Sequence, residues 1–320
     1  MNGLGNAGAR LATIDEGEDG QRIDNYLLRE LKGVPRSHVY RLVRSGEVRV
    51  NSGRIDQTYR LRAGDRVRIP PVRVSASPSQ RPAPPAGLAT LPTLFEDAAL
   101  IAIDKPAHLA VHGGSGVSFG VIEQLRAARP EAKFLELVHR LDRDTSGVLL
   151  IAKKRSALTA LHAAWREGAV EKQYLALVSG AWTRTDQVVA APLFRYLLPD
   201  GERRVRIDQA GQSARTVFRR REVGPIATLV EADLETGRTH QLRVHLAHLG
   251  TPILGDEKYG DFALNKRLAK RGLKRMFLHA CRIRLSHPLT GEVLELLAPL
   301  PAELSSFAQR MLMVSDVESL

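Results

Sequence analysis

Hydrophobic residues recur at helical spacing in two segments near the start of the chain. In residues 23–31 they share one helical face, and a glycine and a proline follow. In residues 37–46 they do so again, with Ser37 as a candidate N-cap and a glycine at the end. Short strands are expected around the turn at residues 51–53 and after a later glycine–aspartate pair. This order predicts a compact α/β module over residues 21–74.

Two segments without periodicity flank this module. Residues 1–20 hold one arginine against four acidic residues, and we expect them to form an acidic, flexible tail. Residues 75–93 contain five prolines together with serine and alanine, which is typical of a semi-rigid linker. The linker separates the module from a larger domain, residues 94–320.

Apolar runs with the length of strands dominate the larger domain. Predicted strands lie within residues 94–112 (two strands), 147–154, 172–180, 214–221, 227–237 and 275–285. Predicted helices are fewer and lie within residues 121–130, 156–168 and 245–250. Many strands with few helices between them predict an α+β fold with a largely antiparallel sheet.

Composition narrows the class of protein. The chain has 320 residues, 43% of them hydrophobic and 26% charged, which is ordinary for a globular protein of about two domains. A single cysteine excludes an internal disulfide framework and any multi-cysteine metal site. No apolar run approaches the ~20 residues of a membrane span, and the first residues lack the pattern of a signal peptide. We therefore expect a cytoplasmic protein that does not enter a membrane.

The positive charge is concentrated in the small module. The formal net charge is +12, and residues 21–74 contribute +8 of it, with 13 basic against five acidic residues. All of these bases except Lys32 are arginines, which favour bidentate phosphate contacts. The candidate nucleic-acid contacts are Arg41, Arg44 and Arg49. The alternative is a solvated basic face without a ligand.

One polar loop between two strand-like runs, residues 139–147, combines a histidine, two arginines and two aspartates. Functional groups gather on loops that rigid strands hold in place, so this loop is a candidate for catalysis. The other interpretation is a connecting turn whose acids cap backbone amides.

Two further segments contain candidate residues. Lys172 and Tyr174 lie two apart on a predicted strand and share a face, although a half-buried tyrosine on a sheet needs no function. Residues 240–246 alternate like a strand, which would point His240 and His245 to opposite faces and disfavour a shared metal ion. His245 and His248 could share an ion only if a helix begins there. We expect no metal site.

An arginine in the last of these segments needs a partner. Arg243 lies among apolar residues, and a buried arginine requires an anion. An aspartate from the loop 139–147 would serve.

Together these segments resemble the signature motifs of a known family in order and spacing. HRLDRDTSG, EKQYLALVSG and LETGRTHQLRVHLAHLGTPILGDEKYG are similar to the motifs of the RluA family of RNA pseudouridine synthases. Residues 22–51 and 113–126 resemble the RluC type, which modifies several uridines of large-subunit (23S) ribosomal RNA. The module 21–74 resembles the small S4-like RNA-binding fold. The resemblance runs from about residue 21 to residue 305.

The resemblance implies roles for individual residues. Asp142 would be the catalytic aspartate, acting either as a nucleophile or as a base. Arg243 would pair with it and lower its pKa. Tyr174 would lie against the target base, and Arg140 would enter the RNA stack as the uridine swings out. His139, next to it, is a further expected RNA contact.

The resemblance also implies the fold, the reaction and the partner. The core would be a mixed, mostly antiparallel sheet with flanking helices and a cleft across its middle. The reaction would need no cofactor: the bond from ribose C1′ to uracil N1 breaks, the base rotates, and C1′ rejoins at carbon 5. The expected partner is 23S ribosomal RNA or a large-subunit assembly intermediate, bound by a monomer.

Two other functions remain open from the sequence. A non-catalytic RNA-binding or ribosome-assembly protein could keep the architecture, although a pure binder has no use for a buried aspartate–arginine pair. A nucleic-acid glycosylase also extrudes a base and uses an aspartate. Free uracil as a product would distinguish a glycosylase from a synthase.

Overall fold

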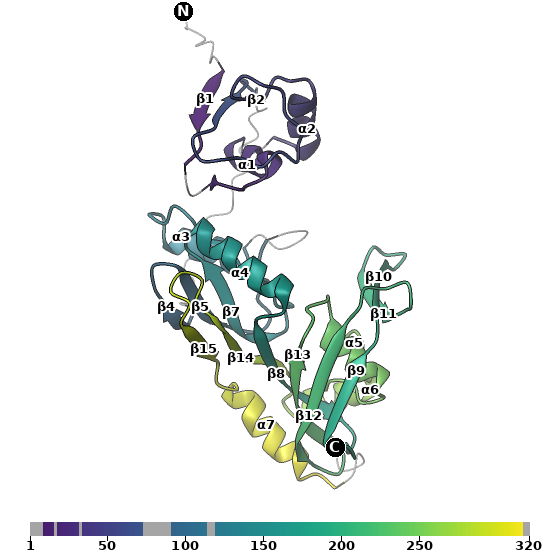
Figure 1. Ribbon diagram of the computed structural model, residues 1–320. Coiled ribbons are helices and arrows are strands. Elements are labelled where there is room, and N and C mark those ends of the chain that lie inside the picture. Colours follow the sequence, from purple (N-terminus) through teal and green to yellow (C-terminus); the bar gives the residue numbers. More distant parts are fainter. Residues whose placement is uncertain (1–8, 16–17, 32–33, 73–90, 114–118, 316–320) are drawn as a thin grey trace, which may run out of the picture. The chain divides into compact units, whose positions relative to one another are not determined.

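The computed structural model describes residues 9–15, 18–31, 34–72, 91–113 and 119–315. The chain divides into two compact units, Met1–Pro85 and Ala86–Leu320 (Figure 1). Most of the expected linker, up to residue 90, lies outside the described residues, and its last residue, Thr93, already begins a strand.

The first unit consists of two helices and a three-stranded antiparallel sheet with β3 in its centre. This confirms the helices and the small sheet that the apolar pattern predicts. Helix α2 begins at Arg36, so Pro35 takes the N-cap position and Ser37 does not. The elements are β1 (Arg10–Thr13), α1 (Ile23–Glu30), α2 (Arg36–Arg44), β2 (Arg49–Val50) and β3 (Arg66–Ile69).

The prediction of a flexible tail is wrong for the described part of residues 1–20. Residues 10–13 pair with the open edge of β3, and Ile14, directly after them, is buried in the core of the module. Two of the four acidic side chains that suggested disorder are bound: Glu18 pairs with Arg29, and Asp19 accepts the amide of Ala63. Segments this short carry no periodicity, so their pairing depends on tertiary contacts.

The second unit is built on a ten-stranded sheet, which confirms the expected mixed, mostly antiparallel architecture. Only β7 and β14 run parallel; all other neighbours are antiparallel. In sheet order the strands are β4 (Thr93–Glu96), β5 (Leu100–Lys105), β7 (Ser146–Ala152), β14 (Leu278–Ser286), β8 (Glu171–Ser179), β13 (Ala227–Leu234), β12 (Arg215–Val223) and β9 (Asp186–Ala190), with β6 (Glu136–Leu137) on β7 and β15 (Val293–Leu297) on β14.

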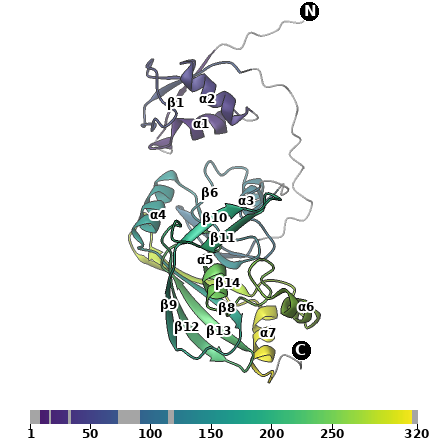
Figure 2. The ribbon, with the colours of Figure 1, turned by 90° about the vertical axis from the view of Figure 1, so that its right-hand side faces the viewer.

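Helices cover both faces of one half of this sheet. Ile101 and Ile103 pack with α3 (Val121–Ala128), whereas Leu100 and Ala102 pack with α4 (Arg155–Glu167). Burial on both faces explains why β5 and β7 appear as continuous apolar runs. Three further helices, α5 (Gln241–His248), α6 (Phe262–Lys270) and α7 (Ala302–Leu312), place apolar side chains in one core cluster with Phe218 of β12 and Val230 of β13. Figure 2 shows α6 and α7 beside each other.

The alternation of residues 240–246 is not that of a strand. Residues 241–248 form helix α5, and six consecutive residues from Gln241 to Leu246 are buried. A helix that is buried all round has no polar face, so the spacing of its apolar residues carries no helical signal. His240 and His245, the two histidines considered as metal ligands, bind different partners. His240 bonds with Tyr259, whereas His245 bonds with Thr216 and the carbonyl of Ala191.

A second sheet of two strands went unpredicted. Strands β10 (Leu193–Leu197) and β11 (Arg203–Ile207) form a hairpin that follows β9 directly in sequence. Within the described residues, no helix is long and apolar enough to cross a membrane.

Candidate active site

The loop that carries Asp142 joins β6 to β7 and is held at both ends. Leu141 is buried in the core, and the amide of Thr145 donates to the carbonyl of Asp142 at 3.2 Å. At the start of β7, the Ser146 hydroxyl hydrogen bonds with the buried His279 at 2.8 Å. The side chain of Asp142 is left about one third exposed, at 30%, and faces a cleft. The loop therefore presents a carboxylate on a rigid base.

Arg243, in the first turn of α5, lies between two carboxylates. Its Nη1 donates to Asp142 Oδ2 at 3.1 Å, while Nε and Nη2 donate to the two oxygens of Asp256, both at 2.7 Å. Burial opposes the charged form, but the hydrogen bonds to Asp256 and Asp142 raise the pKa of Arg243. The guanidinium is thus permanently charged and fixed in one orientation. The structure brings together the two residues that the sequence pairs.

Asp256 is the partner that the sequence analysis missed. It is 1% exposed and also accepts the amides of Lys258 and Tyr259. Burial alone would raise the pKa of Asp256, but the contact with Arg243 lowers it. Its segment, GDEKYG, lies within the stretch that resembles the family motifs, but an acid after a glycine is also typical of an ordinary turn, and the sequence by itself assigns this acid no role.

His240 links the site to the β10–β11 hairpin. Its backbone is left-handed, with φ +54°, and its Nε2 lies 3.9 Å from Asp142 Oδ2. The hydroxyl of Tyr259 accepts the amide of Val205 at 3.0 Å and bonds with His240 Nδ1 at 2.8 Å. Burial lowers the pKa of His240. The Arg243 guanidinium lies 5.1 Å from the centre of the Tyr259 ring.

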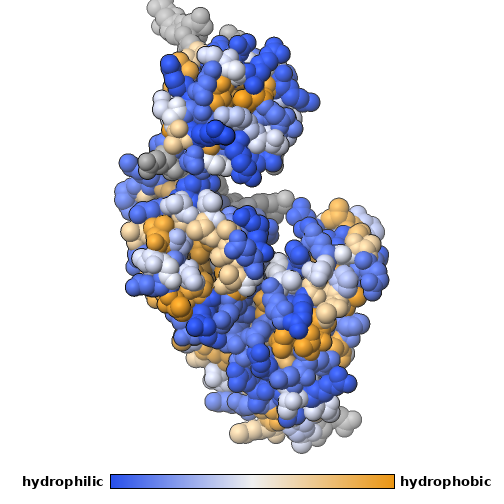
Figure 3. Space-filling model, in the orientation of Figure 1, coloured by the Kyte–Doolittle hydropathy of each residue, from blue (hydrophilic) through white to orange (hydrophobic). Residues whose placement is uncertain are grey.

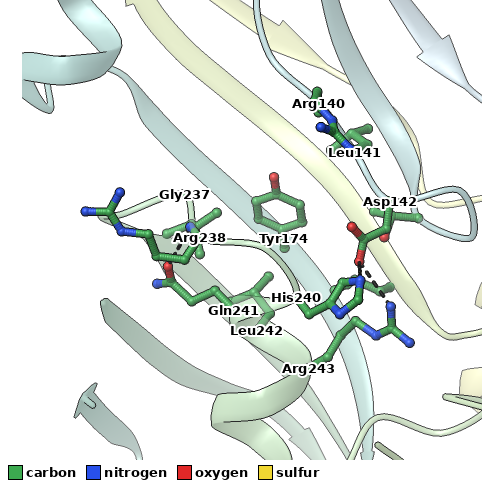
Figure 4. Close-up of a pocket in the computed structure, with 13 residues that line it drawn as sticks. Arg140, Leu141, Asp142, Tyr174, Gly237, Arg238, His240, Gln241, Leu242 and Arg243 are labelled. Carbon is green, nitrogen blue, oxygen red and sulfur yellow. Dashed lines mark hydrogen bonds and ion pairs between the residues drawn. The ribbon is translucent and has the colours of Figure 1, made fainter. Parts of the chain in front are cut away.

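Tyr174 lies on β8 and borders the same pocket as Asp142. Figure 4 shows its ring between the Asp142–Arg243 pair and Arg238. The side chain is 9% exposed, and burial raises the pKa of its hydroxyl, with the charge of Asp142 acting in the same direction. The hydroxyl therefore stays protonated at neutral pH.

The two residues before Leu141 have different surroundings. Arg140 is exposed and borders the pocket. His139 stacks on Trp165, with ring centres 5.0 Å apart, and its Nε2 accepts the amide of Leu150. Burial lowers the pKa of His139 to about 3, so its ring is neutral. Arg140 is free to contact a ligand, whereas His139 also holds β7 and α4 together.

A large cleft extends from these residues. Its volume is about 1090 Å³, and it continues from Asp142 and Tyr174 to Lys172 and then to Trp165 and Arg166 of α4. Figure 3 shows a notch between the α4 side and the hairpin side of the second unit, with hydrophilic residues along its rim. The cleft has room for several nucleotides, and its walls carry both aromatic and basic side chains.

Six arginines of the first unit illustrate two kinds of surroundings. One group is neutralised by ion pairs: Arg10 with Glu30, Arg22 with Asp24, and Arg29 with Glu18. The other group, Arg41, Arg44 and Arg49, is exposed and forms no ion pair with an acidic residue that the structure describes; its hydrogen-bond partners include the ring of His38 and the carbonyls of Tyr40 and Gly46. The second group is therefore available to phosphates.

No metal site accompanies this arrangement in the part of the chain that the structure describes. There, no three His, Cys, Asp or Glu side chains lie where they could hold an ion.

Comparison with known proteins agrees with the geometry. Residues 99–248 match the family model of RNA pseudouridylate synthases, and residues 21–67 match that of the S4 domain. The chain is 54% identical over 302 residues to ribosomal large subunit pseudouridine synthase C of Pasteurella multocida, covering 93% of each chain. It is 51% identical over 308 residues to the Escherichia coli K12 protein of that name, covering 94% of this chain and 96% of the other.

The fold has a counterpart among solved structures. The human RNA pseudouridylate synthase domain containing 4 superimposes with a TM-score of 0.57 at 28% identity, covering 69% of this chain and 92% of the other. The chain therefore belongs to the RNA pseudouridylate synthase family and is an RNA pseudouridine synthase. Within the family it is of the RluC type, with an S4 domain ahead of the synthase domain.

Proposed function

We propose that this enzyme converts uridine to pseudouridine at several positions of 23S ribosomal RNA, without a cofactor. The relatives that share 51–54% of the sequence over nearly the whole chain are named ribosomal large subunit pseudouridine synthase C. The basic S4 domain and the wide cleft suit a large, folded RNA substrate. The enzyme would act as a monomer on the RNA or on an assembly intermediate.

The observation that carries the proposal is the Asp142–Arg243 contact at the edge of the cleft. The reaction needs a carboxylate that stays ionised, either to attack the sugar or to take a proton from it. Arg243, itself held by Asp256, keeps one oxygen of Asp142 in place and compensates its charge. The other oxygen carries no bond to Arg243 and is available to the substrate.

Tyr174 and Arg140 would handle the base. With its hydroxyl protonated, Tyr174 can pack against the uracil. When C1′ rejoins at carbon 5, the hydroxyl would take up the proton that carbon 5 loses and release its own proton to water in the cleft. Arg140, exposed at the rim, would fill the gap in the RNA stack that the extruded uridine leaves. Extrusion costs a few kcal/mol, and such a replacement offsets part of that cost.

Tritium release from 23S ribosomal RNA labelled at uridine carbon 5 tests the proposal. The wild type should release tritium, and Asp142→Asn should bind the RNA nearly normally and release almost none. A residual rate above about 1% of the wild type would remove Asp142 from its role.

The same assay separates the other two functions. No release by the wild type, on naked RNA and on precursor particles, would favour a non-catalytic RNA-binding protein. Free uracil among the products would identify a glycosylase instead.

A further inference from the structure

Lys172 is a nearly buried cation without a protein partner. It precedes Tyr174 by two residues on β8, is 7% exposed, and borders the cleft. Its ammonium makes no hydrogen bond or ion pair with any residue that the structure describes. Burial lowers the pKa of Lys172, and no neighbouring charge acts on it in the opposite direction.

Other buried cations of this unit are satisfied. The ammonium of Lys105, which is fully buried, donates to the carbonyls of Pro106, Leu109 and Arg143. Arg243 has two carboxylates. Lys172 Nζ keeps some accessible surface toward the cleft, but the side chain around it is buried and no carboxylate that the structure describes compensates its charge. Partial loss of water without a partner destabilises the charged form. Such a charge at the wall of a binding cleft indicates that an anion arrives from outside.

The position of Lys172 identifies this anion. Lys172 and Tyr174 project from the same face of β8, roughly 7 Å apart along the strand. Lys172 also lies close enough to His139 to lower the pKa of that residue, which places its charge at the end of the cleft next to α4. An anion bound to Lys172 would therefore lie next to the place where the target base packs against Tyr174.

We propose that Lys172 binds a backbone phosphate of the RNA strand, next to the nucleotide whose base lies against Tyr174. The inference rests on the proposed function, since it requires an RNA strand in this cleft. The phosphate provides the negative charge that no described carboxylate of the protein provides. The unfavourable free energy of burying the ammonium is therefore offset only when RNA is bound. Arg166, exposed on α4 at the same end of the cleft, adds to the positive potential there.

The test compares Lys172→Met with the wild type and with Lys172→Arg, in the full chain. Single-turnover tritium release from 23S ribosomal RNA, with enzyme in excess, gives a half-saturating enzyme concentration and a maximal rate at each salt concentration. We expect Lys172→Met to raise the half-saturating concentration about tenfold, to leave the maximal rate near that of the wild type, and to reduce the salt slope by about 0.7–0.9. Lys172→Arg should keep the slope.

Thermal unfolding of the free protein is the second measurement. Lys172→Met removes an unpaired buried charge, so it should unfold at the same or a higher temperature than the wild type. The matched control is Lys133→Met, which removes an exposed lysine outside the cleft. It should change neither the unfolding temperature nor the half-saturating enzyme concentration and its salt slope.

Three results would overturn the proposal. The first is an unchanged half-saturating concentration and salt slope in Lys172→Met. The second is a loss confined to the maximal rate, which would place Lys172 in the chemical step. The third is a lower unfolding temperature, which would show that the ammonium holds the fold. Release by the wild type tests the proposed substrate separately, so failure of that proposal is recognised on its own.

Discussion

The guanidinium of Arg243 donates to the carboxylate of Asp142 at 3.1 Å, although 101 residues of chain separate the two. Asp142 comes from a loop between strands and Arg243 from the first turn of a helix. The contact is fixed because each partner is held independently, Asp142 by its loop and Arg243 by Asp256. The orientation of the Asp142 carboxylate therefore depends on a second carboxylate, Asp256, which binds Nε and Nη2 of the same guanidinium.

Asp256→Asn should slow the reaction without weakening RNA binding. Asparagine retains the size of the side chain but loses the charge that holds Arg243 in place, and hydrogen bonds to charged groups contribute about 1.5–3 kcal/mol. We expect the single-turnover rate to fall about 10- to 100-fold at saturating enzyme. Asp208→Asn, which removes a half-buried acid paired with Arg206 away from the cleft, is the control. An unchanged rate in a folded Asp256→Asn protein would contradict the positioning role.

Gly147→Ala should destabilise the fold severely. Gly147 has φ +111°, and a Cβ there would lie 2.1 Å from the carbonyl oxygen of Ala280 on the neighbouring strand. We expect a loss of at least about 2 kcal/mol in the free energy of unfolding, measured by urea denaturation. Gly201 has φ +83°, but no atom lies within 4 Å of the position a Cβ would take. Gly201→Ala should therefore lower the free energy of unfolding by only about 1 kcal/mol. Equal losses of stability in the two variants would show that β14 moves away from residue 147 and makes room for the added Cβ.

The stability of the protein should fall with pH below about 6.5 in a way that depends on His139. Burial lowers the pKa of His139 in the folded protein to about 3. Between about pH 6.5 and pH 3, this residue therefore binds a proton in the unfolded chain and remains neutral in the folded protein. The sign is a loss of stability as the pH falls, by about 1 kcal/mol between pH 6.5 and pH 5.5 for this group. Urea denaturation of His139→Gln should lack this part of the loss. Identical pH slopes in both proteins would contradict the shifted pKa.

The unpaired arginines of the S4 domain should contribute to the salt dependence of RNA binding. Changing Arg41, Arg44 and Arg49 together to glutamine should reduce the slope of log affinity against log salt by about 2–3, because fewer counterions are released. The maximal single-turnover rate should stay unchanged. As a control, Arg10→Gln removes a charge that Glu30 already neutralises and should have little effect on the slope. An equal change in both proteins would mean that ion pairing does not distinguish the two groups.

Much of the fold could be predicted from local pattern. The strands β7, β8 and β13 are long apolar runs, and their burial dominates the pairing, so the sequence identifies them directly. Helix α5 could not be identified, because all of its faces are buried and the periodicity of an exposed helix is absent. Strand β1 and the β10–β11 hairpin are too short to show a pattern. Strand β1 forms because β3 has an open edge, and the hairpin is held by Tyr259, whose hydroxyl accepts the amide of Val205.

The candidate site divides in the same way. The resemblance of its motifs to those of the RluA family singles out Asp142, Tyr174 and Arg243, whereas the residue pattern alone leaves Asp142 and Asp144 equivalent. The roles of Asp256 and Lys172 appear only in three dimensions: one is defined by the guanidinium it holds, the other by the partner it lacks. The sequence sets which groups are available and which segments are buried. Their pairing depends on distances between segments far apart in the chain, and these distances exist only once the sheet has formed.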